Sequence, residues 1–385
     1  MYNRNLFDNL KMKGILMKKT VMLLALAIPL LFSCSAVKDL SSYEVDMDND
    51  KAKIEDIFDS YTYVMLETAD RAILTDVRKV DVSDRYISVL DKNRVVVFDR
   101  SGKYVSRVDA YGRGHGEYVS LDDYAIHDTC VYVLSRMQKA INVYGLSGKF
   151  VKSLKLDDWY SHIVFCGDNT IILSSENAND SKRNFLVYDV AKGRKIKSLD
   201  PFGKNENMLL GDYTPFCGRS EGGYYVTHPF SHDIYEIDAD GIKPCMALSF
   251  ADKGKLPQGA EAMSYAQLVE ATTHKSVVKS LGLYCRLPGC SFVTFDMFGK
   301  VGGMVPYVCR IDSGGLCRVA SIGDEYSAMF PYITKPMAVY GDCFVSACPA
   351  EVILGIEKYY KLSKFSKLGL AKESNYVVFF NRLKH

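Results

Sequence analysis

The chain has 385 residues, of which 48% are hydrophobic and 24% charged, proportions that exclude an intrinsically disordered protein and are typical of a globular one. Its formal net charge is +2; residues 1–34 carry five Lys or Arg and one acid, so the remainder has a net charge of −2. A near-neutral surface without a basic cluster argues against nucleic acid as a partner.

The N-terminus has the pattern of a targeting signal. Lys18 and Lys19 precede an apolar run at 21–32, too short for a membrane-spanning helix, which needs about 20 residues, but typical of a signal peptide. The run ends in Ser33-Cys34, which resembles a bacterial lipobox; the alternative is an ordinary secretory signal with an incidental Cys. We expect residues 1–34 to be a signal peptide with an upstream extension, Cys34 to be lipidated, and residues 35–54 to form a flexible tether.

Ten cysteines follow Cys34, an even number that permits disulfides in an exported protein. Several lie inside apolar runs, where a thiol packs as a small hydrophobe, so we expect mostly free, buried thiols. Cys285 and Cys290, on either side of a Pro-Gly turn, are the best disulfide candidate. The chain has no CxxC pair, which argues against a structural zinc site.

A hairpin pattern repeats along the chain. Residues 96–105 align without gaps to 142–151, and both predict two strands joined by a tight glycine turn. Related turns follow, and the turn glycines are Gly102, Gly148, Gly193, Gly241 and Gly315. The first three spacings, 46, 45 and 48 residues, match one four-stranded propeller blade each. The last spacing, 74 residues, predicts a helical insertion within 259–281.

An apolar run precedes each hairpin, and the six runs are 86–90, 131–134, 170–173, 224–226, 291–295 and 342–345. The strand-like segments 61–66 and 376–380 have no neighbour in sequence, so we expect them to pair and close a ring without exposed edges. A second helical insertion is predicted near 351–368. The sequence therefore predicts one all-β domain over residues 55–385, a six-bladed β-propeller with two short helical insertions.

The chain resembles the NHL-like six-bladed β-propeller lipoproteins of Gram-negative bacteria. The lipobox and the segments FDRSGK at 98–103, GRGHGEY at 112–118 and PFSHDIY at 229–235 carry the resemblance. It implies a monomer anchored by lipid to the outer membrane, facing the periplasm or the cell surface. The implied role is binding or scaffolding, with a small polar ligand, a glycan or an envelope protein as partner.

The glycine-rich loop at 112–118 provides the candidate ligand-binding residues, Arg113, His115, Glu117 and Tyr118. Its GxGxG spacing, with no helix following, argues against a nucleotide-binding loop. We expect a connection between blades whose side chains project at the rim of the central channel. The alternative is a structural loop in which Arg113 pairs with Glu117.

His228, His232 and Asp233 are weak candidates for metal ligands, since Pro229 rules out a helix that would place both histidines on one face. The sequence contains no GxSxG motif and no recognisable catalytic triad, so no catalytic residue is predicted. No cofactor is predicted either, and the alternative of a structural or catalytic divalent metal ion in the channel is left open. The alternative to a binding protein is a metal-dependent propeller enzyme with lactonase-like or lyase-like activity.

Overall fold

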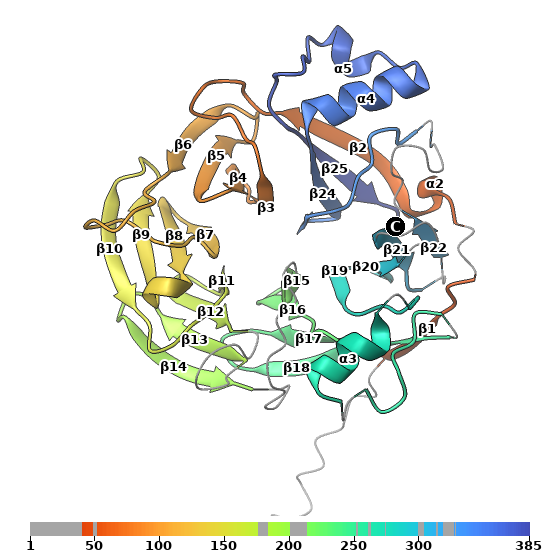
Figure 1. The fold of residues 1–385 in the computed structure, drawn as a ribbon, viewed down its shortest axis with the longest axis horizontal. Coiled ribbons are helices and arrows are strands. Elements are labelled where there is room, and N and C mark those ends of the chain that lie inside the picture. The colour runs from red at the N-terminus through yellow and green to blue at the C-terminus, as the bar shows by residue number, and fades with distance from the viewer. Residues whose placement is uncertain are drawn as a thin grey trace, which may run out of the picture. The chain divides into compact units, whose positions relative to one another are not determined.

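The computed structural model describes residues 41–48, 52–175, 184–200, 214–251, 253–260, 263–273, 275–298, 304–312, 315–318, 327 and 329–385. Residues 42–385 form one unit, and residues 1–41 form another, of which only Ser41 is described. Within the larger unit, six small sheets follow one another around a ring (Figure 1). The predicted fold, a six-bladed β-propeller, is therefore confirmed.

Each blade runs outwards from the ring axis, and we number the blades 1 to 6 in chain order (Figure 1). Blade 1 comprises β3 (Val77–Val82), β4 (Tyr86–Asp91), β5 (Arg94–Asp99) and β6 (Tyr104–Val108). Blade 2 comprises β7 (Asp123–His127), β8 (Cys130–Ser135), β9 (Ala140–Gly145) and β10 (Phe150–Lys155). Blade 3 comprises β11 (His162–Phe165), β12 (Thr170–Ser174), β13 (Phe185–Asp189) and β14 (Arg194–Leu199). Blade 4 comprises β15 (Phe216–Arg219), β16 (Tyr224–Val226), β17 (Asp233–Ile237) and β18 (Ile242–Phe250). Blade 5 comprises β19 (Leu281–Leu287), β20 (Cys290–Phe298), β21 (Met304–Arg310) and β22 (Gly315–Arg318). Blade 6 comprises β23 (Ala338–Tyr340), β24 (Cys343–Cys348), β25 (Val377–Leu383) and β2 (Phe58–Met65). The six predicted apolar runs correspond to the second strand of each blade.

Blade 6 closes the ring with strands from both ends of the larger unit. β2 is its outer strand and pairs antiparallel with β25, with Tyr61 opposite Asn381 and Met65 opposite Val377. The predicted pairing of 61–66 with 376–380 is therefore confirmed. Gly102, in the turn between β5 and β6, has φ +88°, and a Cβ there would collide with the carbonyl oxygen of Met65. Only glycine fits where blade 1 meets the end of β2.

The expected flexible tether over 35–54 is wrong for its described part. β1 (Ser41–Val45) adds a fifth strand to blade 4 beside β18, and the backbone N–H of Ala251 donates to the carbonyl of Val45 at 3.2 Å. Most β1 side chains are exposed, which explains the polar sequence, because pairing at a sheet edge uses backbone groups and needs no apolar side chain. Residues 1–40, including Cys34, lie outside the described residues.

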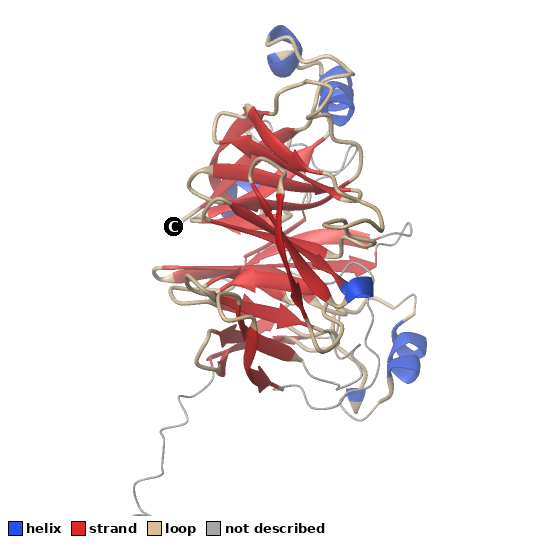
Figure 2. Ribbon diagram, turned by 90° about the vertical axis from the view of Figure 1, so that its left-hand side faces the viewer, coloured by secondary structure: helices blue, strands red, loops and turns tan. Residues whose placement is uncertain are grey.

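The described helices are short and lie in connections between strands: α2 (Ile54–Ile57), α3 (Tyr265–Thr272), α4 (Ala350–Tyr360), α5 (Lys364–Lys367) and the 3-10 turn η1 (Arg136–Gln138). α3 lies between blades 4 and 5 in sequence and projects from one face of the ring, whereas α4 and α5 extend beyond blade 6 (Figures 1 and 2). Both predicted insertions are thus present, and α2 was not predicted. No helix among the described residues is long and apolar enough to cross a membrane.

All nine cysteines whose side chains are described are free, as expected, and the candidate pair Cys285 and Cys290 is among them. Cys285 pairs with Phe292 and Cys290 with Leu287, so the two cysteines are diagonal neighbours on the β19–β20 hairpin. Diagonal neighbours lie about 7–8 Å apart, beyond the usual Cα separation across a disulfide. Both thiols are buried in the core between blades 5 and 6, as expected for small hydrophobes.

Candidate functional site

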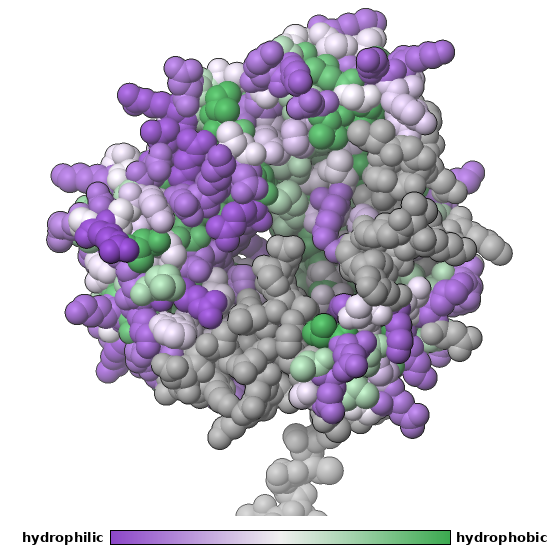
Figure 3. Space-filling view, in the orientation of Figure 1, coloured by the Kyte–Doolittle hydropathy of each residue, from purple (hydrophilic) through white to green (hydrophobic). Residues whose placement is uncertain are grey.

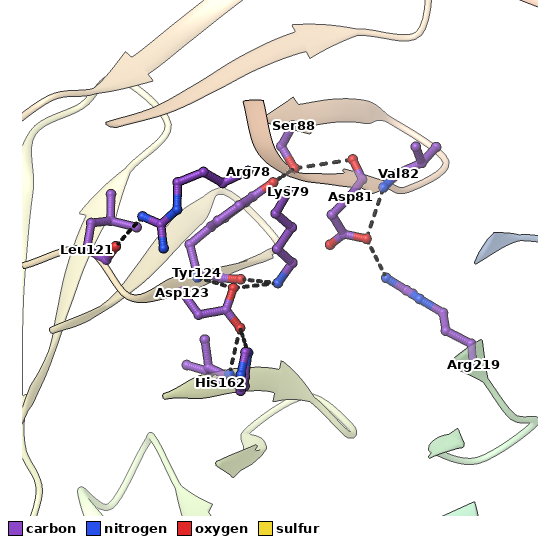
Figure 4. A network of polar contacts seen from close by, with 11 residues as sticks. Arg78, Lys79, Asp81, Val82, Ser88, Leu121, Asp123, Tyr124, His162 and Arg219 are labelled. Carbon is purple, nitrogen blue, oxygen red and sulfur yellow. Dashed lines mark hydrogen bonds and ion pairs between the residues drawn. The ribbon is translucent and has the colours of Figure 1, made fainter. Parts of the chain in front are cut away.

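Polar side chains from the inner strands of three neighbouring blades meet near the ring axis (Figure 4). Lys79 on β3 donates from its ammonium to the carboxylate of Asp123 on β7 at 2.7 Å, and to the carbonyl oxygen of Tyr124 at 3.0 Å. The second oxygen of Asp123 accepts from the backbone N–H of Ile163 at 3.0 Å and lies 3.6 Å from Nδ1 of His162, both on β11. One carboxylate therefore links blades 1, 2 and 3.

Asp123 is buried and charged. Burial acts to raise the pKa of its carboxyl, but the charge of Lys79 and the His162 ring outweigh burial and bring the pKa down to about 2. The carboxylate is therefore ionised at neutral pH with its acceptor positions occupied. We interpret this part of the network as structural, because its partners leave little capacity for a ligand.

A second ion pair crosses the ring axis. Nη2 of Arg219, the last residue of β15, lies 3.5 Å from the carboxylate of Asp81 on β3 (Figure 4). These strands belong to blades 4 and 1, which lie opposite one another in the ring (Figure 1). The two side chains are 54% and 33% exposed, so both reach solvent. Because both side chains reach solvent, either one can bind a ligand in place of the other, which the buried Asp123 carboxylate cannot do.

The local sequence explains how Arg219 and Asp81 reach the axis. On β3, Lys79 and Asp81 alternate with the buried residues Val80 and Val82, because successive strand residues point to opposite faces. On β15, Gly218 lies so close to β19 that a Cβ would collide with the carbonyl oxygen of Tyr284. The absent side chain lets β15 approach blade 5.

The electrostatics keep Arg219 charged. Its guanidinium lies 5.8 Å from the centre of the Tyr224 ring. Burial acts to lower the pKa of Arg219, but Tyr224 and Asp81 outweigh burial and raise it. Arg219 and Asp81 thus present a hydrogen-bond donor and an acceptor side by side. The face of the ring that carries α3 is hydrophilic over blades 1 and 2 and hollowed near its centre (Figure 3).

The predicted loop at 112–118 rests on the outer part of blade 2. The ring of His115 packs edge-on against Phe150 of β10, with centroids 5.3 Å apart, and the hydroxyl of Tyr144 donates to the carbonyl of Gly116 at 2.7 Å. β10 is the outer strand of its blade, so these contacts do not place the loop at the rim of the channel. Arg113 is exposed, and no ion pair joins it to Glu117 in the described chain.

Two residues of this loop have structural roles. The carboxylate of Glu117 accepts from the backbone N–H of Gly114 at 2.6 Å and holds the loop closed. Tyr118 is fully buried, and its hydroxyl donates to the carbonyl of Asn93 at 2.6 Å. Burial raises the pKa of Tyr118. The prediction that Tyr118 contacts ligand is therefore wrong, because its side chain belongs to the core between blades 1 and 2.

The predicted metal candidates do not gather into a site. Nε2 of His232 lies 2.7 Å from the carbonyl oxygen of Val278, and its ring packs against Phe250. Burial lowers the pKa of His228 to about 4 and also lowers that of His232. No group of three or more His, Cys, Asp or Glu side chains in the described part of the chain is arranged to hold a metal ion, these included.

Comparison with known proteins identifies the family of the chain and finds solved structures with a similar fold. A family model described as a domain of unknown function, DUF4934, matches residues 40–382. The chain belongs to the DUF4934 family. This DUF4934 chain is similar to a candidate exported protein of Bacteroides fragilis, with 16% identity, 89% of this chain and 99% of that one covered, and a TM-score of 0.67. It is also similar to a DUF4221 protein of Bacteroides vulgatus, with 10% identity, 88% and 99% covered, and a TM-score of 0.52. At such identities the similarity shows the fold alone. No curated protein matches the chain.

Sequence reasoning missed the polar residues on the inner strands of this DUF4934 protein. Each of these residues lies in or beside a short apolar segment, where an isolated polar residue is easily taken for the end of a strand. They are Lys79, Asp81, Asp123, His162 and Arg219. The available signal was their position one strand upstream of each predicted apolar run. In a propeller that position is the inner strand, so its polar side chains are the ones to examine for ligand contact.

Proposed function

We propose that this DUF4934 protein is a lipid-anchored binding protein of the bacterial envelope whose ring axis binds a small hydroxyl-rich ligand such as a sugar. The observation that carries the proposal is the exposed pair of Arg219 and Asp81 across the axis. A hydroxyl group both donates and accepts hydrogen bonds, so it suits a site that offers a guanidinium donor beside a carboxylate acceptor. Opposite blades contribute the two groups, so a ligand that contacts both lies at the ring axis.

The binding test uses the protein extracted from membranes in detergent and titrated calorimetrically with neutral mono- and oligosaccharides. We expect saturable binding to at least one sugar, and a tenfold or greater loss of affinity in Arg219→Gln. Arg194→Gln, which changes an exposed arginine on the outer strand β14, is the matched control and should bind like wild type. Absence of saturable binding, or equal losses in both variants, would rule out the axis site.

The envelope location rests on the lipobox at Cys34 and the resemblance to NHL-like lipoproteins. Two or three acyl chains attach a protein stably to a membrane, whereas one gives only marginal binding. If Cys34 is acylated, wild type partitions into the membrane fraction and Cys34→Ala does not. Equal solubility of the two proteins would contradict the lipid anchor without affecting the sugar-binding test.

Metal-dependent catalysis is the competing function for the same axis. It requires several carboxylate or imidazole ligands on one ion, and the described residues provide no such group. Calorimetric titration with Zn²⁺, Mg²⁺ and Ca²⁺ separates the two functions. Tight stoichiometric binding of one metal would favour the enzyme and overturn the assignment of the axis to a sugar alone.

A further inference from the structure

Arg100 lies where the ring closes, in the turn between β5 and β6 of blade 1. Its guanidinium carbon is 4.6 Å from the centre of the Tyr340 ring and 4.9 Å from that of Phe380. Tyr340 ends β23 and Phe380 lies on β25, so both rings belong to blade 6. The planar cation is therefore held by aromatic faces of the neighbouring blade.

The hydrogen-bond donors of Arg100 are unused. The guanidinium makes no hydrogen bond or ion pair with any described residue, and its Nη1 is enclosed without a partner. A buried donor without a partner is unfavourable, so such groups normally have one. Arg94, at the start of β5, shows the usual arrangement, because its Nε and Nη2 both donate to the carboxylate of Asp91 at 2.9 and 2.7 Å.

We infer that Arg100, held by Tyr340 and Phe380, is a binding site for a small oxyanion, either a carboxylate or a phosphate. The guanidinium presents its N–H groups as a rigid fork that matches two oxygens of such a group. Because the two aromatic rings already hold the guanidinium, less side-chain freedom is lost on binding. Only Nη1 of the guanidinium is enclosed, so an anion from solvent can reach the N–H groups on Nε and Nη2, which form one side of the fork.

The neighbouring charges leave this site available to an anion. Two nearby carboxylates already have other partners: that of Asp99 accepts from the backbone N–H groups of Ser101 and Lys103, and that of Asp84, in the turn between β3 and β4, accepts from the hydroxyl of Tyr340 at 2.9 Å. This hydrogen bond, followed by burial, raises the pKa of Tyr340, while the charges of Arg100 and Arg219 act against it. The site adjoins the proposed sugar site, since the charge of Arg219 acts on Tyr340, but it does not use the Arg219–Asp81 pair.

The test is calorimetric titration of the detergent-extracted protein with sodium phosphate and with sodium acetate, each against sodium chloride at the same ionic strength. We expect one saturable site for at least one oxyanion, with affinity reduced tenfold or more in Arg100→Gln. Saturation by phosphate alone or by acetate alone identifies which oxyanion the fork accepts. Arg85→Gln removes a neighbouring exposed cation and should bind like wild type.

Two outcomes would overturn the site. One is the absence of saturable binding, which would mean that a buried water satisfies Arg100. The other is an equal loss of affinity in Arg85→Gln and Arg100→Gln, which would mean that the anions respond to general surface charge. If Arg100→Gln does not fold, Arg100→Lys decides, because it keeps the charge and loses the fork. Its affinity should fall at least fivefold, and an unchanged affinity would contradict the inference.

Discussion

Lys79 on β3 and Asp123 on β7 form an ion pair of 2.7 Å that joins the inner strands of blades 1 and 2. Because Asp123 is buried, neutralising it leaves the ammonium without its counter-charge. The ammonium of Lys79 is 30% exposed and can be solvated in part, and a hydrogen bond to a charged group contributes about 1.5–3 kcal/mol, so we expect Asp123→Asn to lower the free energy of unfolding by that amount. Denaturant unfolding measures the change. Asp128→Asn, at a side chain that is 85% exposed, is the control and should change stability by less than about 0.5 kcal/mol.

The same carboxylate gives an acid-dependent stability. The pKa of Asp123 in the folded protein, about 2, lies below its ordinary value near 4, so the stabilisation is complete above about pH 4 and is lost as the pH falls through about 2. The difference in unfolding free energy between wild type and Asp123→Asn should therefore shrink between pH 4 and pH 2. A difference that stays constant over this range would contradict the assigned ionisation.

His228 and His232 should make the protein less stable in mild acid. Burial lowers the pKa of His228 to about 4 and lowers that of His232, so the unfolded chain takes up protons first as the pH falls below about 6.5. Stability is then full above that pH and decreases towards pH 4, by up to about 1.4 kcal/mol per pH unit for each histidine. Unfolding curves of His228→Gln should show a smaller pH slope than those of wild type, and an unchanged slope would contradict the assigned burial of this histidine.

Ring closure predicts that the last strand is indispensable. Deleting residues 376–385 removes β25 and leaves β2 and β24 as unpaired edges, so we expect aggregation or loss of cooperative unfolding. Size-exclusion chromatography and calorimetry report both effects, and deletion of His385 alone serves as the control. A truncated protein that remains monomeric and melts like wild type would show that the ring does not depend on this closure.

Arg113 and Glu117 should differ in their effect on stability. Arg113 is exposed and unpaired with Glu117, so Arg113→Ala should leave the melting temperature within about 1 °C of wild type. Glu117→Ala removes the acceptor of the Gly114 N–H and should lower the melting temperature by several degrees. A large drop in Arg113→Ala would instead support a structural clamp. If Arg113→Ala keeps its stability but loses glycan binding, the loop is a second binding surface.

The repeating hairpins could be predicted because their determinants are local. Gly102 and Gly148 have φ values of +88° and +79°, as a tight turn requires, so their spacing marks the blades. Gly241 lies in the corresponding turn without a positive φ, and there the Asp238 carboxylate accepts the N–H groups of Asp240 and Gly241. The carboxylate of Asp99 accepts backbone N–H groups in the Gly102 turn in the same way, so an aspartate before the glycine is a second local determinant of the repeat.

The candidate site was less predictable because its partners are distant in sequence. Arg219 and Asp81 are 138 residues apart and meet only because blades 4 and 1 face one another in the finished ring. The prediction that Tyr118 contacts ligand failed because its neighbours in the sequence were misleading. Its glycine-rich neighbours indicated an exposed loop, yet its ring contributes to the core and its hydroxyl satisfies a backbone carbonyl. Local patterns describe the backbone of such a loop but not the direction of each side chain.

The pairing of β2 with β25 also sets a time at which the fold can be completed. The two strands are about 300 residues apart, so β2 has no partner until β25, the last strand, is available. Any chain that stops before β25 keeps an unpaired strand, and we expect such chains to be cleaved by proteases at blade 6 before the other blades.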